Sequence, residues 1–378
     1  MRKKVKTGVC KAAQLRDGSR HPFGMLGGVT ALGGGELEVY RQIRNAVPIL
    51  DAAIGKLVRL TGGFTVSCGN RKAERELERF LKTVNAGRGQ VGLESFLAAF
   101  LQSMLVYGRA VGEMVVGGNE ITAVLWGDVT KLYVQEGTSA MEFAFGQWQD
   151  AEVKIFPRQN LILFAAWNPD EENPYGASVF RSMPFLVDVL LKIYSTIGTN
   201  WERAGNVRYS VVYKPQDEAG RIDAQERSEQ IASQWSQAMQ ESRHGVVRDF
   251  VAVGDVQIKV IGADGQILDS EVPVRQILEQ LVAKTGLPPF LLGLNWASTE
   301  RMSAQQTDLL TSELWAIRRT VEPVLLRICR LWMQLHGYAE EPEIVWDEIS
   351  LQDIVEQAHA ALYRAQAEKL MAEQEETT

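Results

Sequence analysis

The longest periodic pattern in the sequence runs from Ser303 to Leu335. Its apolar residues recur every three or four positions, which is the spacing of one face of an α-helix. A helical pattern longer than about 25 residues is unusual in a compact domain, so this segment favours an elongated or assembled structure. Glu322-Pro323 should bend the helix, because proline lacks the N–H that the next backbone hydrogen bond needs. The stripe consists of Leu310, Leu314, Ile317, Val321, Leu325, Ile328 and Trp332.

Two further helices precede this segment. A stripe from Val179 to Trp201 predicts a helix of about seven turns. Pro184 lies either in its first turn, with Ser182 as the N-cap, or at a kink. A shorter stripe over Val272–Leu281 predicts a helix that ends where Gly286–Pro289 follows.

The first part of the chain begins with helical patterns. Residues Glu36–Leu57 predict an amphipathic helix with a kink at Pro48. Phe64–Cys68 alternates like a short strand. A charged helix is predicted around Leu77–Val84, and a more apolar one over Leu93–Met104.

Between Arg109 and Ala166 the apolar period changes to two. The segments EITAVLW, KLYVQ, MEFAFGQW, EVKIF and LILFAAW predict short strands of a mostly antiparallel sheet layer. Three later strand-like runs, RYSVVYKP, VVRDFVAV and VQIKVIG, flank a mostly exposed helix over Asp223–Glu241. This mixture of helices and antiparallel strands predicts the α+β class.

Both ends of the sequence are expected to lie outside the core. Residues 1–35 are basic and then rich in glycine, which predicts a flexible arm, and no apolar segment of a secretion signal follows the basic start. The segment after Ser350 is rich in Ala, Gln and Glu and predicts a polar, peripheral helix.

Charge and composition limit the possible functions. The 378-residue chain has a net charge of -7. This acidic balance argues against a protein that holds nucleic acid statically, because such binding depends on many Lys and Arg contacts to phosphates, but it allows a protein past which DNA slides. No apolar run is long enough to span a bilayer, and three scattered cysteines indicate a reducing compartment.

Two motifs offer chemistry, and each has a simpler interpretation. Gly87–Gly92 (GRGQVG) matches the glycine pattern of dinucleotide sites. A charged helix precedes it instead of the strand that such a site requires, so a turn between two helices is favoured. Asp170, Glu171 and Glu172 could hold a divalent cation, but adjacent acids point in different directions, so a solvated turn is favoured.

No catalytic set can be assembled from the sequence. The histidines are isolated, so they indicate no zinc site, and the common hydrolase and nucleotide-binding motifs are absent. We therefore expect no cofactor and no bound metal. The helical stripes carry tryptophans that we expect in the core more often than at an interface: Trp201, Trp235, Trp315 and Trp332.

An ordered series of segments carries a resemblance to a known family. The series begins with NPYGASVFRSM and continues through the helix Phe180–Arg203, the strand RYSVVYKP and the helix Asp223–Glu241. It ends in AKTGLPPFLLGLNWASTERMSAQQTDLL, and Thr320–Pro323 stands where this family bends its long helix. Over about Glu36–Tyr338 the sequence resembles the portal proteins of tailed bacteriophages.

The resemblance implies an α+β portal fold, assembled as a ring that is usually a dodecamer. Residues 36–176 would form a β-rich wing, 177–205 and 266–287 the two long stem helices, and 206–265 a small α/β clip. After an N-terminal arm of residues 1–35, the remaining parts would be a channel loop (288–300), a long kinked wing helix (301–337) and a short helical crown (338–378).

The resemblance also implies roles for single residues. Pro288 and Pro289 would fix the exit of the second stem helix, and Phe290, Leu291 and Leu292 would pack inward between subunits. Asn295, Trp296, Ser298 and Thr299 would face the channel near passing DNA, with Ser298 or Thr299 as helix cap and Glu300 in the first turn. Partners would dock at Glu226, Glu229 and Trp235 of the clip. Without the resemblance, the loop is interpreted as a hydrophobic connector in a monomer.

The implied function is a DNA channel at one capsid vertex, used in packaging and ejection. Its partners would be the large terminase subunit, a head–tail adaptor, the major capsid protein and a scaffold protein, with no membrane involved. The protein would catalyse no reaction and would lie in the virion, and in the host cytoplasm during assembly. The alternatives are a nucleotide- or metal-dependent enzyme that uses Gly87–Gly92 or Asp170–Glu172, and a monomeric helical adaptor.

Overall fold

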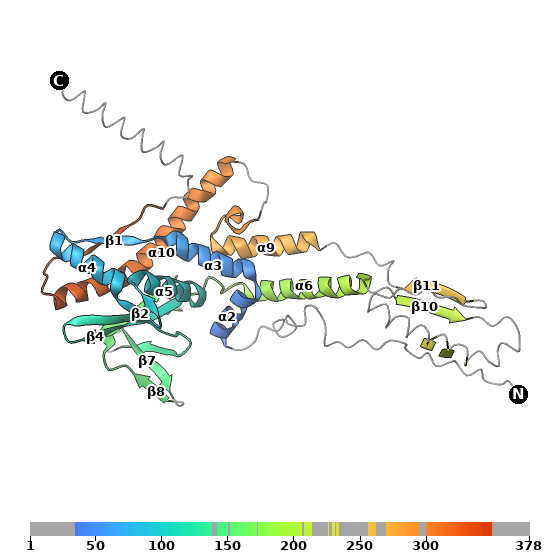
Figure 1. The fold of residues 1–378 in the computed structure, drawn as a ribbon, viewed down its shortest axis with the longest axis horizontal. Coiled ribbons are helices and arrows are strands. Elements are labelled where there is room, and N and C mark those ends of the chain that lie inside the picture. Colours follow the sequence, from blue (N-terminus) through green and yellow to red (C-terminus); the bar gives the residue numbers. More distant parts are fainter. Residues whose placement is uncertain are drawn as a thin grey trace, which may run out of the picture. The chain divides into compact units, whose positions relative to one another are not determined.

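The computed structural model describes residues 35–137, 142–149, 152–171, 173–205, 208–213, 226, 229–230, 232–233, 256–261, 270–294 and 300–349. The chain divides into two units, and Figure 1 labels their helices and strands. The smaller unit contains residues 189–274, and the larger unit contains residues 32–188 and 275–378.

A buried helix organises the larger unit. This helix, α5 (Leu93–Tyr107), buries a wide apolar face that includes Phe96, Phe100 and Met104. A helix with such a face packs it against the core. The elements that contact it include α2 (Glu36–Ala46), α3 (Pro48–Thr61), α4 (Arg71–Thr83), β4 (Arg109–Gly117) and β5 (Glu120–Trp126).

The helix predicted over Glu36–Leu57 is in fact two helices. Val47 between them has an extended backbone (φ -119°, ψ 95°), so the chain breaks where a kink was expected. Pro48 takes the first helical position of α3, where the missing N–H would have no partner in any case.

The strands between residues 85 and 166 form two sheets. One has the order β3-β2-β5-β4-β9 and the other the order β6-β7-β8. All of their pairings are antiparallel except that of β2 with β5, which confirms the predicted mostly antiparallel layer. The strands are β2 (Asn85–Gly87), β3 (Gln90–Val91), β6 (Leu132–Glu136), β7 (Phe143–Gln149), β8 (Glu152–Ile155) and β9 (Ile162–Ala166).

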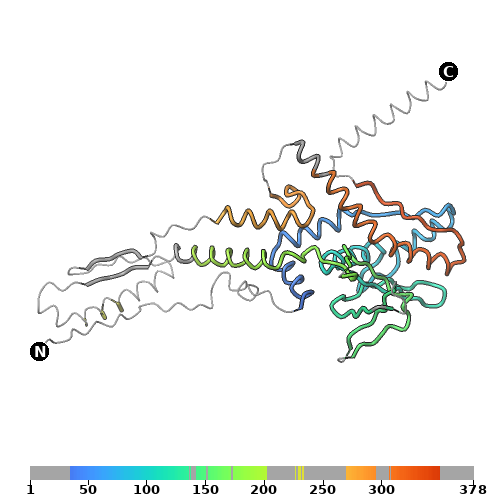
Figure 2. The backbone as a smooth tube through the Cα atoms, turned by 180° about the vertical axis from the view of Figure 1, so that it is seen from behind, coloured from blue at the N-terminus to red at the C-terminus, as the bar shows by residue number. Residues whose placement is uncertain are grey.

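The helix α10 (Glu300–Leu335) continues through the expected bend, with Pro323 inside it. It packs against α3, α4 and β9, and the two views of the backbone show it beside α3 (Figures 1 and 2). Arg327 fixes this packing, because its guanidinium donates to the carbonyls of Ile162 (2.8 Å) and Asn160 (2.6 Å).

Three short strands of the larger unit were not predicted: β2, β3 and a strand that follows α10. The expected strand β1 (Phe64–Ser67) pairs antiparallel with β12 (Glu343–Trp346), which follows α10 in the chain. Within the described residues, no helix combines the length and the apolar character that a membrane span requires.

The smaller unit contains a helix and a pair of strands. Helix α6 (Pro184–Gly205) begins in the larger unit and starts at Pro184, which is the first of the two positions predicted for that proline. Strands β10 (Arg208–Tyr213) and β11 (Val256–Ile261) pair antiparallel, as expected for RYSVVYKP and VQIKVIG. The predicted strand VVRDFVAV, the arm up to residue 34 and the segment after Ser350 lie outside the described residues.

Cys329 provides a chemical test of the packing of α10. Its thiol is buried, and this burial raises its pKa to about 12. Because the thiolate is the reactive form, we expect iodoacetamide at pH 8.5 to alkylate Cys329 more slowly in the native protein than in urea, by a factor on the order of a thousand. Half-buried Cys68 should react in both. Peptide mass spectrometry gives both rates, and equal native rates for the two cysteines would contradict the packing.

Candidate functional site

The predicted channel loop begins where α9 (Glu271–Thr285) ends. Gly286 adopts the left-handed conformation (φ 72°) that commonly terminates a helix and that glycine takes without steric cost. The buried hydroxyl of Thr285 donates to the Val282 carbonyl (2.7 Å) and accepts from the Leu287 N–H (3.3 Å). The direction of the chain is therefore fixed before the first proline.

Pro288 and Pro289 open a tight turn. Pro288 has an extended backbone (φ -57°, ψ 135°), and Pro289–Leu292 forms the 3-10 helix η3. The N–H of Leu291 donates to the Pro288 carbonyl, and the N–H of Gly293 donates to the Phe290 carbonyl, both at 3.1 Å. Because each proline fixes its own φ, little conformational freedom remains in this turn.

The turn has an anchored side and an exposed side. Leu287 and Pro288 are buried, and η3 packs against α3. Leu291 and Leu292 are half-buried, whereas Phe290 is 41% exposed. A phenylalanine held on a rigid turn loses little entropy when a partner covers it. The turn can therefore present an apolar side chain to a second molecule.

Part of the predicted channel loop lies in this turn. The five residues from Pro288 to Leu292 are adjacent in it, and Glu300 is the first residue of α10, as its predicted place in the first helical turn requires. The remaining loop residues, Asn295, Trp296, Ser298 and Thr299, lie outside the described residues.

The residues predicted to dock partners belong to the smaller unit. Glu226 and Glu229 are helical and exposed, as expected for the polar face of the helix predicted there. Trp235 lies outside the described residues.

Gly87–Gly92 forms a hairpin, so the expected turn between two helices was wrong. β2 and β3 pair within it, because β2 also finds a partner in β5 that the local pattern does not reveal. Gly92 precedes α5, and a Cβ placed on it would lie 3.3 Å from the Lys82 carbonyl. The start of α5 is thus packed against the end of α4, where a pyrophosphate would need open space.

The acidic turn at Asp170 is occupied by local contacts. One Asp170 oxygen accepts from the Asn173 N–H (2.6 Å), and the other pairs with Arg181 (3.0 Å). Glu172 lies outside the described residues. Nowhere in the described part of the chain do three His, Cys, Asp or Glu side chains gather as metal ligands.

The tryptophans of the helical stripes are not all in the core. Trp332 is 4% exposed, as expected, but Trp201 is 63% and Trp315 is 45% exposed. The expectation of burial within the chain was wrong for these two, because helical spacing predicts an apolar face without telling what covers it. Trp235 lies outside the described residues.

One buried charge was not predicted from the sequence. Arg318 of α10 is 1% exposed and lies between the rings of Trp315 and Trp346, at 5.0 and 5.1 Å from their centroids. An arginine on a helix that is otherwise charged at its surface gives no signal of burial. Trp346 could not have been paired with it, because β12 was not predicted.

Comparison with known proteins gives likeness in structure and none in sequence. No family model matches the chain, and no curated protein matches it. A chain in the virion of a native gene transfer agent particle aligns with 16% identity and a TM-score of 0.62, over 90% of both chains.

Two structures of the neck of this kind of particle align similarly. A chain in the neck of the empty particle, computed with C6 symmetry, has 18% identity and a TM-score of 0.64, over 89% of this chain and 91% of that chain. A chain in the neck of the native particle, computed with C12 symmetry, has 17% identity and a TM-score of 0.59, over 84% of this chain and 85% of that chain. At this identity the likeness is one of fold: the chain shares the mixed helix-and-sheet fold of these virion and neck chains, in agreement with the predicted α+β class.

Proposed function

We propose that this protein is a portal that forms a ring in the neck of a phage-like particle and serves as its DNA channel. The likeness in fold to neck chains, which extends over nearly the whole chain, carries the proposal. Those necks were computed with C6 and C12 symmetry, so the ring proposed here is a dodecamer.

Exposed apolar side chains support assembly into a ring. Association of subunits removes exposed apolar side chains from water, which favours assembly. A cyclic ring requires two different surfaces on each subunit, one for each neighbour. Several described residues could supply them: Phe185, Trp201, Leu309, Trp315 and Phe290, which are 75%, 63%, 69%, 45% and 41% exposed.

The channel itself would depend on the loop after Pro288. Phe290, Leu291 and Leu292 would pack between subunits, and Asn295–Thr299 would face the DNA. The acidic balance of the chain suits this role, because a predominantly acidic lining repels phosphates and lets DNA slide. The clip would dock terminase and the head–tail adaptor through Glu226 and Glu229, and the protein would catalyse no reaction.

The test is the mass of the purified full-length protein by light scattering, with negative-stain images of the same fraction. We expect rings of about twelve subunits with a central hole. Phe290→Ser should lower the ring fraction severalfold at a fixed protein concentration, because a polar residue replaces an exposed apolar contact. Co-expression with the capsid protein extends the test to assembly that needs a capsid.

Val91→Ser is the control, because Val91 is also an exposed apolar residue, at 60%, and lies on β3 away from the loop. Rings that survive Val91→Ser but not Phe290→Ser support the loop as a subunit contact. A monomer under every condition, with capsid protein included, contradicts the proposed function and leaves the monomeric adaptor.

A further inference from the structure

Helix α4 carries an unusual division of its charges. Its sequence, RKAERELERFLKT, holds five Lys and Arg and three Glu. The carboxylates are all engaged within the chain, and so are the two lysines. The three arginines, Arg71, Arg75 and Arg79, are exposed and are called the arginine stripe below.

Glu74 is turned away from the stripe towards the chain before the helix. One of its oxygens accepts from the N–H groups of Cys68 (2.9 Å) and Gly69 (3.2 Å) and from the Ser67 hydroxyl (3.1 Å). These hydrogen bonds, with that from Cys68 foremost, lower the pKa of Glu74. Arg71 also lowers this pKa by its charge, but Glu74 forms no ion pair with it and bonds instead to donors of the chain before the helix.

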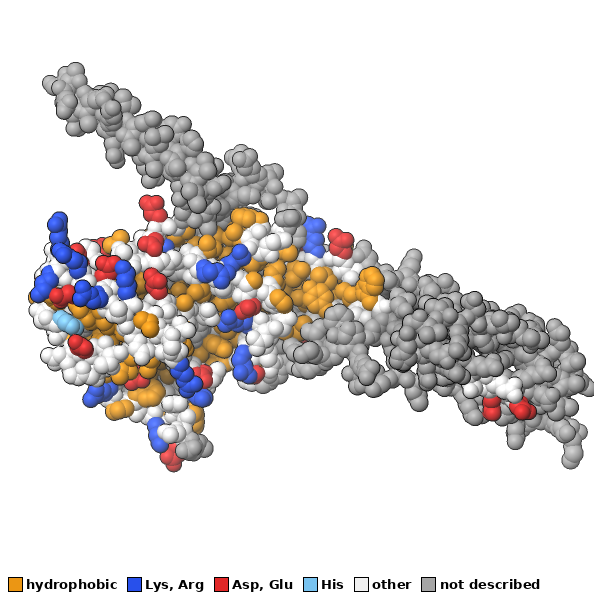
Figure 3. Space-filling model, in the orientation of Figure 1, with side chains coloured by type: hydrophobic (Ala, Val, Ile, Leu, Met, Phe, Trp, Pro, Cys, Tyr) orange, Lys and Arg blue, Asp and Glu red, His pale blue; other side chains and the backbone are white. Residues whose placement is uncertain are grey.

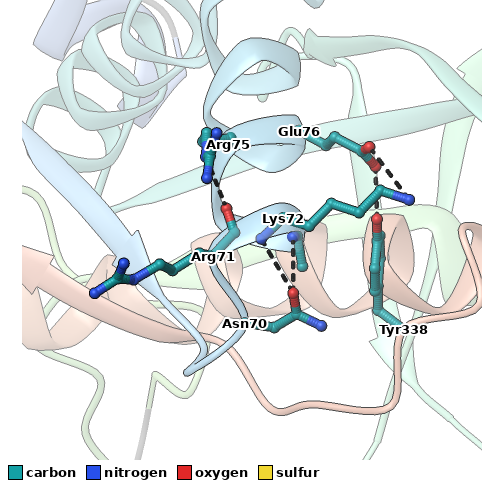
Figure 4. A network of polar contacts seen from close by, with 7 residues as sticks. Asn70, Arg71, Lys72, Arg75, Glu76 and Tyr338 are labelled. Atoms are coloured by element: carbon teal, nitrogen blue, oxygen red, sulfur yellow. Dashed lines mark hydrogen bonds and ion pairs between the residues drawn. The ribbon is translucent and has the colours of Figure 1, made fainter.

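Glu76 and Glu78 are engaged by other partners. Glu76 accepts from the Tyr338 hydroxyl (2.6 Å) and lies 3.9 Å from the Lys72 ammonium, as Figure 4 shows. Glu78 pairs with Lys82 at 2.6 Å. In the close view, Arg71 extends away from the group formed by Lys72, Glu76 and Tyr338 (Figure 4).

No carboxylate of the described residues forms an ion pair with the arginine stripe. Within the same residues, the one side-chain hydrogen bond of the stripe runs from Arg75 Nε to the Arg71 carbonyl (3.2 Å). Lys and Arg side chains gather over this end of the larger unit, interspersed with acidic ones (Figure 3).

The spacing of the stripe gives it a linear charge pattern. Residues four apart lie on one face of a helix and are separated by about 6 Å along its axis. This is of the same order as the distance between successive phosphates of one DNA strand. Guanidinium groups also bind phosphate oxygens in a bidentate manner, whereas lysine acts as a point charge.

We propose that Arg71, Arg75 and Arg79 bind the phosphate backbone of double-stranded DNA. The source of that DNA rests on the proposed function, but the binding chemistry does not depend on the ring. An otherwise acidic chain would thereby hold DNA at the exposed face of α4 while its channel lets DNA slide. Charge complementarity carries the assignment. A regular row of arginines that form no ion pair with any described residue matches a regular row of phosphates more closely than it matches an irregular acidic protein surface.

The test measures the affinity of the full-length protein for a fluorescein-labelled duplex of mixed sequence, by anisotropy over a range of salt concentrations. Replacing all three arginines with glutamine should lower the slope of log K against log salt by about 2.7, since each phosphate contact contributes roughly 0.9. At 0.1 M salt the affinity should fall on the order of a hundredfold. Replacing them with lysine should preserve most of the slope.

The control variant carries Lys131→Gln, Lys154→Gln and Arg158→Gln, which remove the same charge from exposed positions outside α4. It should bind DNA nearly as the unchanged protein does. Equal losses in both variants, or no loss in either, overturn the proposal, as does an acidic peptide that competes with DNA at a lower concentration than unlabelled duplex. Light scattering on each variant measures ring formation independently of DNA binding. If the unchanged protein forms rings but binds no DNA, this inference is refuted and the proposed function is not.

Discussion

Replacing Gly176 with alanine is expected to lower the free energy of unfolding by at least about 3 kcal/mol, a large effect for a single methyl group. Gly176 has φ 93°, which L-residues with a side chain rarely adopt. A Cβ placed on it would overlap the Gly108 carbonyl oxygen and would lie 2.9 and 3.0 Å from the N and O of Trp167. These neighbours are backbone atoms, so none can rotate out of the way.

The surrounding hydrogen bonds prevent the backbone from yielding. The Trp167 N–H donates to the Gly108 carbonyl, and the Ala177 N–H donates to the Trp167 carbonyl, both at 2.7 Å. Two residues later, the Ser178 hydroxyl donates to the Val106 carbonyl in the last turn of α5 (2.5 Å). The segment NPYGASVF is therefore hydrogen-bonded to the end of α5. It supplies donors to backbone carbonyls that the helix itself leaves unpaired.

Gly118→Ala is the matched control for this prediction. Gly118 also has a positive φ of 64°, but a Cβ on it would meet nothing within 4 Å. Its substitution should lower the free energy of unfolding by about 1 kcal/mol, which is the penalty of a positive φ for an alanine without any steric overlap. Urea unfolding followed by circular dichroism measures both variants. Equal losses would mean that the contact with Gly108 is not as close as the structure has it.

Periodicity identified the elements that bury a wide apolar face. The stripes of α5 and α10 and the alternation of β5 to β9 are long enough to define a helical or strand period, so these elements could be predicted. β12 has only four residues and pairs with β1, which lies far from it in the sequence. β2 and β3 are shorter still. Short strands of this kind form because a distant partner is available, and no local pattern records that partner.

The candidate site could be predicted only in part, for a similar reason. The two prolines and two glycines around Phe290 restrict the backbone locally, so a rigid apolar turn was expected from the sequence and is present. The arginine stripe was missed because α4 contains both signs of charge, which is typical of a solvated helix. Only the contacts of Glu74, Glu76 and Glu78 tell which charges remain free.

Arg318 presents the opposite case, a charge that the fold encloses. Its Nε donates to the carbonyl of Thr61, the last residue of α3 (2.8 Å), where a cation also suits the negative end of the helix dipole. Neither terminal nitrogen has a hydrogen-bond partner among the described residues, and burial lowers the pKa of the guanidinium, while the charge of Asp347 opposes this shift. The rings of Trp315 and Trp346 add two cation–π contacts that stabilise the buried cation.

We expect Arg318→Ala to lower the free energy of unfolding by about 3 kcal/mol, through the cavity left between two indoles and the unpaired Thr61 carbonyl. Arg318→Met should lower the free energy of unfolding by less than half as much. Methionine fills the space without a charge, and it removes the two guanidinium nitrogens that lack hydrogen-bond partners among the described residues. Arg319 is the exposed neighbour of Arg318, and Arg319→Ala removes the same charge. The free energy of unfolding of this variant should stay within about 0.5 kcal/mol of that of the unchanged protein. Urea unfolding, monitored by tryptophan fluorescence and circular dichroism, measures all three. If the methionine variant proves as damaging as the alanine variant, the cation–π contacts rather than the packing hold α3, α10 and β12 together.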